Sequence, residues 1–242
     1  MQSLFDEIRR QFILNFIDDD RWLFLLDGLL VTIRVALLAL IFGIMIGIVV
    51  SIVRSTYEKN IDQMKRGPGR ILLVIINRIC IIYLTVIRGT PIVVQLLIFY
   101  FVVLVNVSTG ELIGIIAFSI NAGAYIAEIF RGGIMSIDNG QFEAGRSLGF
   151  SYVQTMQYII IPQAFKNILP TLANEFIVLL KETSVLGFIG VTDLTRGGWL
   201  ISGRTYSPFM PLIAVALIYL AFVMLLAWLV GKLERRLRVS ER

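Results

Sequence analysis

The uncharged stretch VALLALIFGIMIGIVVSIV, residues 35–53, decides what kind of fold this chain can form. A helix of about 20 apolar residues crosses the hydrocarbon of a bilayer, and this stretch is long enough to do so. Two further stretches without a charged side chain cover residues 89–110 and 205–231. The whole chain is 57% hydrophobic and 16% charged, whereas soluble proteins carry about 25% charged residues. The sequence therefore predicts an all-α integral membrane protein.

Five transmembrane helices are predicted, at residues 28–53, 72–104, 112–132, 167–190 and 206–231. The second is too long for one straight helix and contains Arg88 and Pro91, so we expect it to be tilted, kinked or broken. The fourth is interrupted by Glu175, Lys181 and Glu182. Gly43 and Gly47 in the first are four residues apart, a spacing typical of close helix packing.

The composition excludes several classes of catalytic site. There is no histidine, and Cys80 is the single cysteine, so zinc sites, histidine-dependent nucleophiles and an internal disulfide are ruled out. No Gly-x-x-x-x-Gly-Lys-Ser/Thr loop occurs in the sequence, so if the protein uses ATP, another chain must supply the ATP site. We therefore predict no catalytic residue, no metal ligand and no cofactor in this chain.

Basic residues indicate the orientation in the membrane, because cytoplasmic loops carry an excess of lysine and arginine. Acidic residues dominate the first 27 positions, which is also unlike a cleavable signal peptide. The basic residues gather after the first span and at the end of the chain: Arg54, Lys59, Lys65, Arg66, Arg70, Lys232, Arg235, Arg236, Arg238 and Arg242. They flank spans instead of forming one patch, so the net charge of +5 indicates topology and not a nucleic-acid partner.

This charge pattern predicts an N-terminus outside and a C-terminus in the cytoplasm. The expected organisation is an extracytoplasmic segment at residues 1–27, a transmembrane domain at 28–232 and a basic cytoplasmic tail at 233–242. The loop at residues 133–166 then lies in the cytoplasm.

This loop holds a polar segment, residues 141–170, inside an otherwise apolar chain. We expect an irregular stretch to end at Gly140-Gln141 and a short helix to follow from Glu143 to Leu148. Gly149 can adopt the left-handed conformation that ends a helix, and Ser151 can cap the next one. Two short helices at a fixed bend form a knob that suits a groove on a partner.

The motifs of this loop are similar to a known family. Glu143-Ala144-Gly145, Gly149 and Ile161-Pro162 resemble the cytoplasmic signature loop of importer-type ABC transporter permeases, with Gly145 and Ile161 in place of the usual alanine and leucine. Five motifs, in the right order, resemble the polar amino-acid permeases of the histidine, arginine and glutamine type. They are Arg88-Gly89-Thr90-Pro91, the stretch 121–133, Ile161-Pro162-Gln163-Ala164, Asn174-Glu175-Phe176 and Lys181-Glu182-Thr183-Ser184.

The resemblance implies a type I ABC importer permease, a subunit of the bacterial inner membrane that is not itself an enzyme. Its expected partners are two ATPase subunits that use ATP and Mg, a second permease subunit, identical or sister, and an extracytoplasmic amino-acid-binding protein. The loop would be the coupling helix, with Glu143, Ala144, Gly145 and Gly149 as the docking core. The alternative is a loop helix that only packs on its own bundle.

Polar residues within the spans are candidates for the substrate pathway, because ionisable groups there are costly and usually face a cavity or pair internally. One helix face would carry Asn121, Tyr125 and Glu128. A second helix would carry two neighbouring polar rows, Glu175 with Glu182 and Asn174 with Lys181. Together they offer donors for a carboxylate and acceptors for an ammonium. The alternatives are an ion pair of Glu128 with Arg131 and a structural role for Lys181 with Glu182.

Two other functions remain as alternatives to the importer subunit. A self-sufficient secondary carrier or channel could use the intramembrane carboxylates for ion coupling, although the span count is small and no second, inverted half is present. An intramembrane enzyme lacks a histidine, a metal cluster or a nucleophile elbow. The sequence leaves open which amino acid is carried and whether the pathway is a homodimer.

Overall fold

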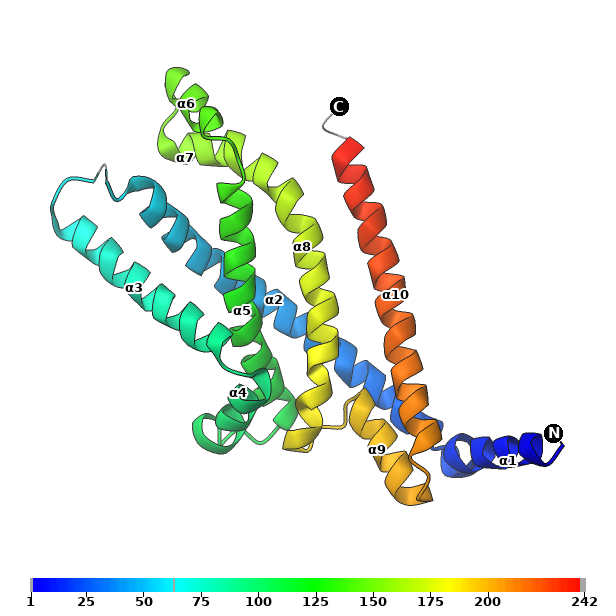
Figure 1. The fold of residues 1–242 in the computed structure, drawn as a ribbon. Helices are drawn as coiled ribbons and strands as arrows, with labels where there is room; N and C mark the ends of the chain where they lie inside the picture. The colour runs from blue at the N-terminus through cyan, green and yellow to red at the C-terminus, as the bar shows by residue number, and fades with distance from the viewer. Residues whose placement is uncertain (1, 63, 240–242) are drawn as a thin grey trace. The chain divides into compact units, whose positions relative to one another are not determined.

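A computed structural model describes residues 2–62 and 64–239 of the chain, and in this part of the chain all regular secondary structure is helical (Figure 1). Arg242 of the predicted tail lies outside the described residues. The α-helices are α1 (Gln2–Phe12), α2 (Trp22–Asn60), α3 (Pro68–Gly89), α4 (Ile92–Ile98), α5 (Gly110–Met135), α6 (Asn139–Ser147), α7 (Tyr152–Thr155), α8 (Ile161–Glu182), α9 (Leu194–Thr205) and α10 (Phe209–Val239).

Within the described residues, four helices are long and apolar enough to cross a membrane: α2, α3, α5 and α10. Their exposed side chains fit a lipid environment, since α3 exposes Ile75, Ile79 and Ile82 and α10 exposes Leu220 and Met224. The predicted span at residues 167–190 coincides with α8 and a following 3₁₀ segment, Thr183–Ile189. It is not among the four, because its charged residues lower the hydropathy.

The predicted second span is broken in the structure. α3 ends at Gly89 and α4 begins at Ile92, with Thr90 and Pro91 between them. Pro91 has no backbone N–H to continue the helical ladder. The Thr90 hydroxyl donates a hydrogen bond to the Val86 carbonyl at 2.8 Å, which satisfies one of the carbonyl groups at the end of α3.

The chain divides into two compact units, which we describe separately. One unit consists of Met1–Leu38, Ile92–Phe118 and Ile177–Trp228, and the other of Ala39–Pro91, Ser119–Phe176 and Leu229–Arg242. Four helices, α2, α5, α8 and α10, contribute residues to both units.

The first unit has its core around α9. Leu194 and Ile201 of this helix are fully buried and pack with Leu25 and Val215. The Asp193 carboxylate, itself buried, accepts hydrogen bonds from the backbone N–H groups of Thr195 and Arg196 and so caps α9. In the same place the Thr32 hydroxyl accepts from the Leu194 N–H at 3.2 Å.

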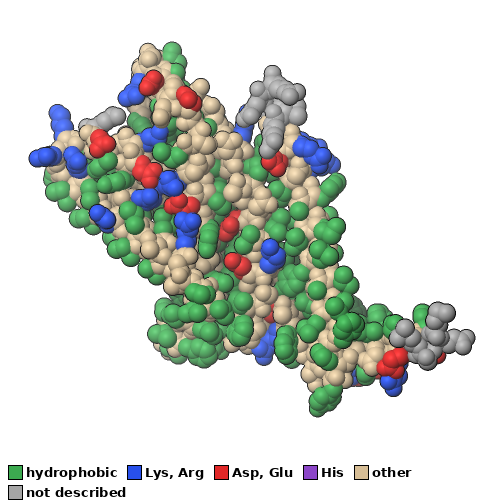
Figure 2. All heavy atoms as spheres, in the orientation of Figure 1, with side chains coloured by type: hydrophobic (Ala, Val, Ile, Leu, Met, Phe, Trp, Pro, Cys, Tyr) green, Lys and Arg blue, Asp and Glu red, His purple; other side chains and the backbone are tan. Residues whose placement is uncertain are grey.

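The second unit has two apolar clusters. Val50, Cys80, Leu84, Ala124 and Ala127 form the first, and the second consists of Ile134, Ile137, Ile160, Ala164 and Ile168. Figure 2 shows charged side chains gathered over α6 and the end of α2, whereas hydrophobic side chains cover α3. The charged surface of this unit therefore lies near α6.

The close packing predicted for Gly43 and Gly47 is confirmed. A Cβ atom at Gly47 would lie 2.6 Å from Ile126 Cγ2, and one at Gly43 would lie 3.0 Å from Ala122 Cβ. α2 and α5 can approach this closely only because both positions lack a side chain. The contact fixes the second half of α2 against α5.

Candidate functional site

The polar loop of the second unit forms two short helices joined by a tight turn. The Asp138 carboxylate accepts from the Gly140 N–H at 2.6 Å and caps α6. The predicted irregular stretch up to Gly140-Gln141 is therefore wrong: α6 begins at Asn139, because Asp138 supplies a cap that the sequence reasoning overlooked.

The predicted end of this helix and the start of the next are confirmed. Gly149 has a φ of +81°, and the Phe150 N–H donates to the Gly145 carbonyl at 3.0 Å across it, as in a glycine-terminated helix. Ser151 and Gln154 form a reciprocal capping box at the start of α7. The chain then continues through a π-helical turn, Met156–Ile160, into α8.

Three of the four predicted docking residues, Glu143, Ala144 and Gly149, are exposed on this loop, whereas Gly145 is buried. Sequence reasoning missed the apolar side chains around them, of which Leu148, Val153 and Tyr158 are 72%, 68% and 65% exposed. The signal was available, since these are large apolar residues in an otherwise polar loop. A short loop that exposes large apolar side chains is suited to binding another protein.

Gly145 is buried because Thr155 of α7 packs directly against it. A Cβ atom at position 145 would lie 2.6 Å from Thr155 Oγ1 and 2.7 Å from Thr155 Cγ2. The departure from the alanine of the similar family motif therefore has a physical reason. The β-branched Thr155 side chain fills the space that an alanine methyl group would take.

We expect Gly145→Ala to weaken the contact between α6 and α7, because Oγ1, Cγ2 and Cβ of Thr155 would all lie within 3.2 Å of the added methyl group, and a change of the Thr155 rotamer does not move its Cβ. Overpacking of this kind costs about 1–3 kcal/mol. The double variant Gly145→Ala, Thr155→Ala should recover most of this loss, as measured by the thermal unfolding of the purified protein. Equal destabilisation in the single and double variants would contradict the explanation.

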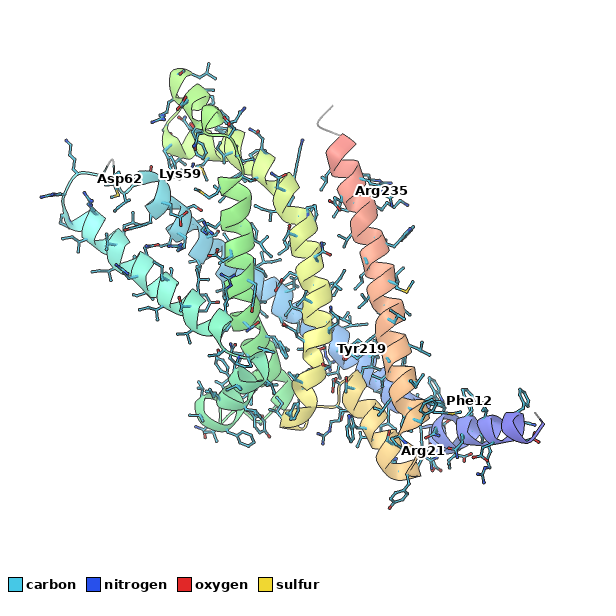
Figure 3. The ribbon with its side chains drawn as sticks, in the orientation of Figure 1. Phe12, Arg21, Lys59, Asp62, Tyr219 and Arg235 are labelled. Carbon is cyan, nitrogen blue, oxygen red and sulfur yellow. The ribbon has the colours of Figure 1, made fainter. Side chains whose placement is uncertain are left out.

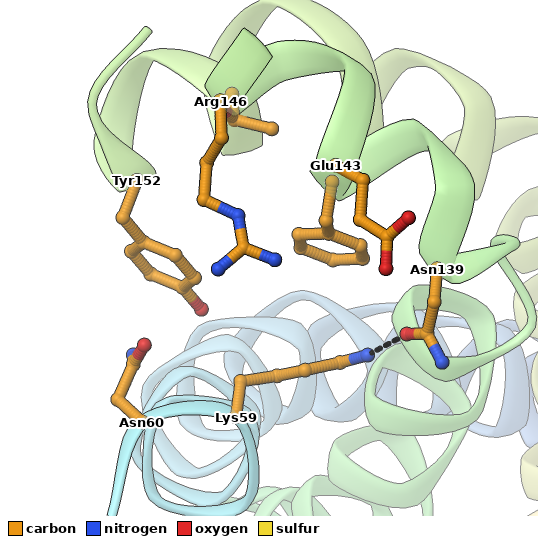
Figure 4. Close-up of a pocket in the computed structure, with 8 residues that line it drawn as sticks. Lys59, Asn60, Asn139, Glu143, Arg146 and Tyr152 are labelled. Atoms are coloured by element: carbon orange, nitrogen blue, oxygen red, sulfur yellow. Dashed lines mark hydrogen bonds between the residues drawn. The ribbon is translucent and has the colours of Figure 1, made fainter. Parts of the chain in front are cut away.

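A polar cavity of about 290 Å³ lies between this loop and the end of α2 (Figure 4). The Lys59 ammonium donates to Asn139 Oδ1 at 2.8 Å and lies 4.5 Å from the centroid of the Phe142 ring. Burial raises the pKa of Tyr152, and hydrogen bonds with the Asn60 and Thr56 side chains oppose this rise. The loop is thus held to α2 by polar contacts as well as by the chain itself.

The predicted pathway residues of α5 also lie in the second unit. Asn121 is buried, and Tyr125 has the Arg88 guanidinium 5.5 Å from its ring centroid. Glu128 forms the ion pair with Arg131 that the sequence suggested, at 2.8 Å.

Sequence reasoning missed the partners of this ion pair. Arg131 also contacts Glu58 at 3.4 Å, and Glu58 pairs with Arg54 at 3.0 Å. No sequence spacing connects Glu58 of α2 with Arg131 of α5, so only the fold brings them together. The chain of charges is internally matched, as is usual for ionisable groups near a membrane interior.

The predicted residues of α8 divide between the two units. Asn174 is exposed and donates to the Pro170 carbonyl at 3.1 Å, and Glu175 is half-buried; both belong to the second unit. Lys181 is exposed and Glu182 is half-buried in the first unit. A pathway role for these four residues and for Asn121, Tyr125 and Glu128 stays a prediction.

The described residues contain no group of three His, Cys, Asp or Glu side chains that could hold a metal ion. The loop that carries α6 and α7 instead offers an exposed surface.

The comparison with known proteins agrees with the sequence motifs of this loop. A family described as the inner membrane component of binding-protein-dependent transport systems matches residues 67–239. The chain belongs to this family. A membrane component of this kind crosses the bilayer several times, in agreement with the apolar helices.

Individual members of the family are similar over most of their length. A putative glutamine transport system permease protein of Rickettsia bellii is 37% identical over 221 residues, covering 90% of this chain and 94% of the relative. The arginine transport system permease protein of Bacillus subtilis is 36% identical over 228 residues, with the same coverage. The crystal structure of an amino acid ABC transporter with histidines has a TM-score of 0.76 at 38% identity, covering 88% of this chain and 94% of that one.

Proposed function

We propose that this chain is the membrane permease subunit of an ATP-driven importer for polar amino acids. The observation that carries the proposal is the match to the binding-protein-dependent inner membrane family over residues 67–239. Relatives of glutamine and arginine transport, similar over nearly their whole length, support the substrate class. The chain itself is a non-enzymatic part of such a system.

The proposed partners follow from the same assignment. Two ATPase subunits, which use ATP and Mg, each dock on the loop of one permease subunit, at α6 and the turn after it. In this chain the docking core is Glu143, Ala144, Gly145 and Gly149, of which the buried Gly145 supports the surface by packing against Thr155. A second permease subunit, identical or sister, completes the pathway, and an extracytoplasmic binding protein delivers the amino acid. The exposure of Glu143 and of the apolar side chains Leu148, Val153 and Tyr158 on the same loop supports this docking surface.

The proposed topology has the N-terminus outside and the C-terminus in the cytoplasm of a bacterial inner membrane. Residues 1–27 are extracytoplasmic, 28–232 form the transmembrane domain and 233–242 are the cytoplasmic tail. The contact between Lys59 and Asn139 supports this arrangement, because it joins the basic loop after α2 to the loop that carries α6. Basic residues favour the cytoplasmic side, so both loops are assigned to it.

In the proposed cycle, ATP binding closes the ATPase subunits, their movement displaces α6, and the spans open alternately to the two sides. An amino acid has both a carboxylate and an ammonium group, so it needs donors and acceptors along its path. Asn121, Tyr125 and Asn174 can supply both kinds of group. The carboxylates of Glu128, Glu175 and Glu182 accept, and Lys181 donates.

The proposal is tested by reconstitution into liposomes. The tagged chain is purified alone or together with the ATPase that co-purifies from its host, and uptake of labelled glutamine, arginine and histidine is measured. We expect uptake only when ATPase, internal ATP and binding protein are all present. Uptake by the chain alone, driven by a proton or sodium gradient, would instead show a secondary carrier, which the matched family does not favour.

A further inference from the structure

The last turn of α2 contacts both α6 and α7, the two short helices of the polar loop. This turn and both short helices belong to the second unit. Lys59 reaches α6, where it meets Asn139 and the face of the Phe142 ring. Thr56 and Asn60 form hydrogen bonds with the hydroxyl group of Tyr152 on α7. Figure 3 marks Lys59 at the end of α2, and Figure 4 shows its side chain extended toward Asn139 beneath α6.

The Lys59 ammonium group makes two contacts with α6, a hydrogen bond and a cation–π contact. Its ammonium group is a charged donor to an amide oxygen, which makes a stronger hydrogen bond than a neutral donor does. The same group lies over an aromatic face, where the ring quadrupole attracts a cation. Both partners belong to α6, so one side chain of α2 holds this helix at two points, one in its first turn and one a turn further on.

α6 also contacts α7 through Gly145 and Thr155, and α8 through the hydrogen bond that Gln163 Nε2 donates to Gln141 Oε1 at 3.3 Å. The cavity of about 290 Å³ separates α6 from α2 around Lys59, and the chain on either side of α6 is non-helical at residues 136–138 and 148–151. Such segments can absorb a change in backbone angles and let a short helix swivel. α2, in contrast, is held firmly, since Gly43 and Gly47 lie against α5.

We propose that Lys59 is a positioning residue that makes the end of α2 a second mechanical connection between the spans and α6. The first connection is the chain itself, through α5 and α8. This inference rests on the proposed function, in which α6 is where the ATPase docks. Without the Lys59 contact, α6 still binds the ATPase, but a rotation of α6 is no longer transmitted to α2. ATP hydrolysis is then less tightly linked to transport.

The test is Lys59→Met in the full complex, reconstituted with its ATPase and binding protein. Methionine keeps an unbranched side chain but removes the charge and the donor. We expect the amount of co-purified ATPase to be unchanged and the ATP hydrolysed per imported amino acid to rise about fivefold or more, the lower end of common coupling effects. Lys59→Arg, which keeps a cation and its donors, should retain a ratio near that of the wild type.

Lys65→Met is the matched control, because Lys65 is an exposed lysine of the loop that follows α2 and its loss changes the net charge equally. Asn139→Ala should raise the ratio as well, and the double variant Lys59→Met, Asn139→Ala should raise it no further than Lys59→Met alone. If Lys59→Met impairs assembly of the complex, the ratio of hydrolysed ATP to imported amino acid is measured in Asn139→Ala, which removes the same contact from the other side. An unchanged ratio in a fully assembled complex overturns the inference, whereas a wild-type chain that transports without any ATPase overturns the proposed function.

Discussion

Glu143→Lys should abolish ATP-driven uptake and reduce the amount of ATPase that co-purifies with the chain. Glu143 is exposed on α6, where we place the centre of the ATPase contact. Breaking a hydrogen-bonded charge pair at an interface costs about 2–5 kcal/mol, so a loss of tenfold or more in bound ATPase is expected. The measurement is the ratio of ATPase to permease after affinity purification, together with uptake in proteoliposomes.

Asp62→Lys provides the control for this reversal of charge. Asp62 is an exposed acid just beyond the end of α2 (Figure 3), so the variant changes the net charge of the chain equally without touching α6. It should retain its ATPase. Normal uptake and normal ATPase binding in Glu143→Lys would show that the ATPase does not dock on α6.

Gly47→Leu should prevent the second unit from packing correctly. The first added atom would lie 2.6 Å from Ile126 Cγ2 and 3.0 Å from the Ala127 backbone nitrogen, so a change of rotamer alone cannot relieve the clash. Between membrane helices, packing itself drives association, because lipid is as apolar as the side chains. The expected cost exceeds the about 1–3 kcal/mol of ordinary overpacking, and the yield of folded protein in detergent should fall sharply.

Gly231→Leu is a suitable comparison, because a Cβ atom at Gly231 of α10 meets nothing within 4 Å. Its yield and its thermal unfolding temperature should stay close to those of the unchanged protein. If Gly47→Leu behaves in the same way, α2 and α5 do not pack through this glycine.

Local features of the fold followed well from the sequence. The uncharged run at residues 35–53 lies within α2, and Pro91 lies at a break between helices. Gly149 and Ser151 take the conformations expected for a helix end and a cap. Each of these depends on a few neighbouring residues, so their chemistry suffices to predict them.

Features that join distant parts of the chain did not follow in the same way. The ion pair of Glu128 and Arg131, three residues apart, could be anticipated, but the additional contact of Arg131 with Glu58 could not. Likewise, nothing in the motif containing Gly145 indicates that Thr155 fills the space beside it. The start of α6 differs from its predicted position for a local reason, since the Asp138 carboxylate caps the helix ahead of Asn139.

The sequence by itself determined that this chain is a helical membrane protein with a polar loop between its apolar stretches. Composition and local pattern decide these properties, because bilayer insertion and helix capping depend on a few turns at most. Only the tertiary structure showed that Lys59 of α2 holds Asn139 of α6. These residues are far apart in the chain, and only the packing of α2 against the rest of its unit brings the ammonium group within reach of its acceptor.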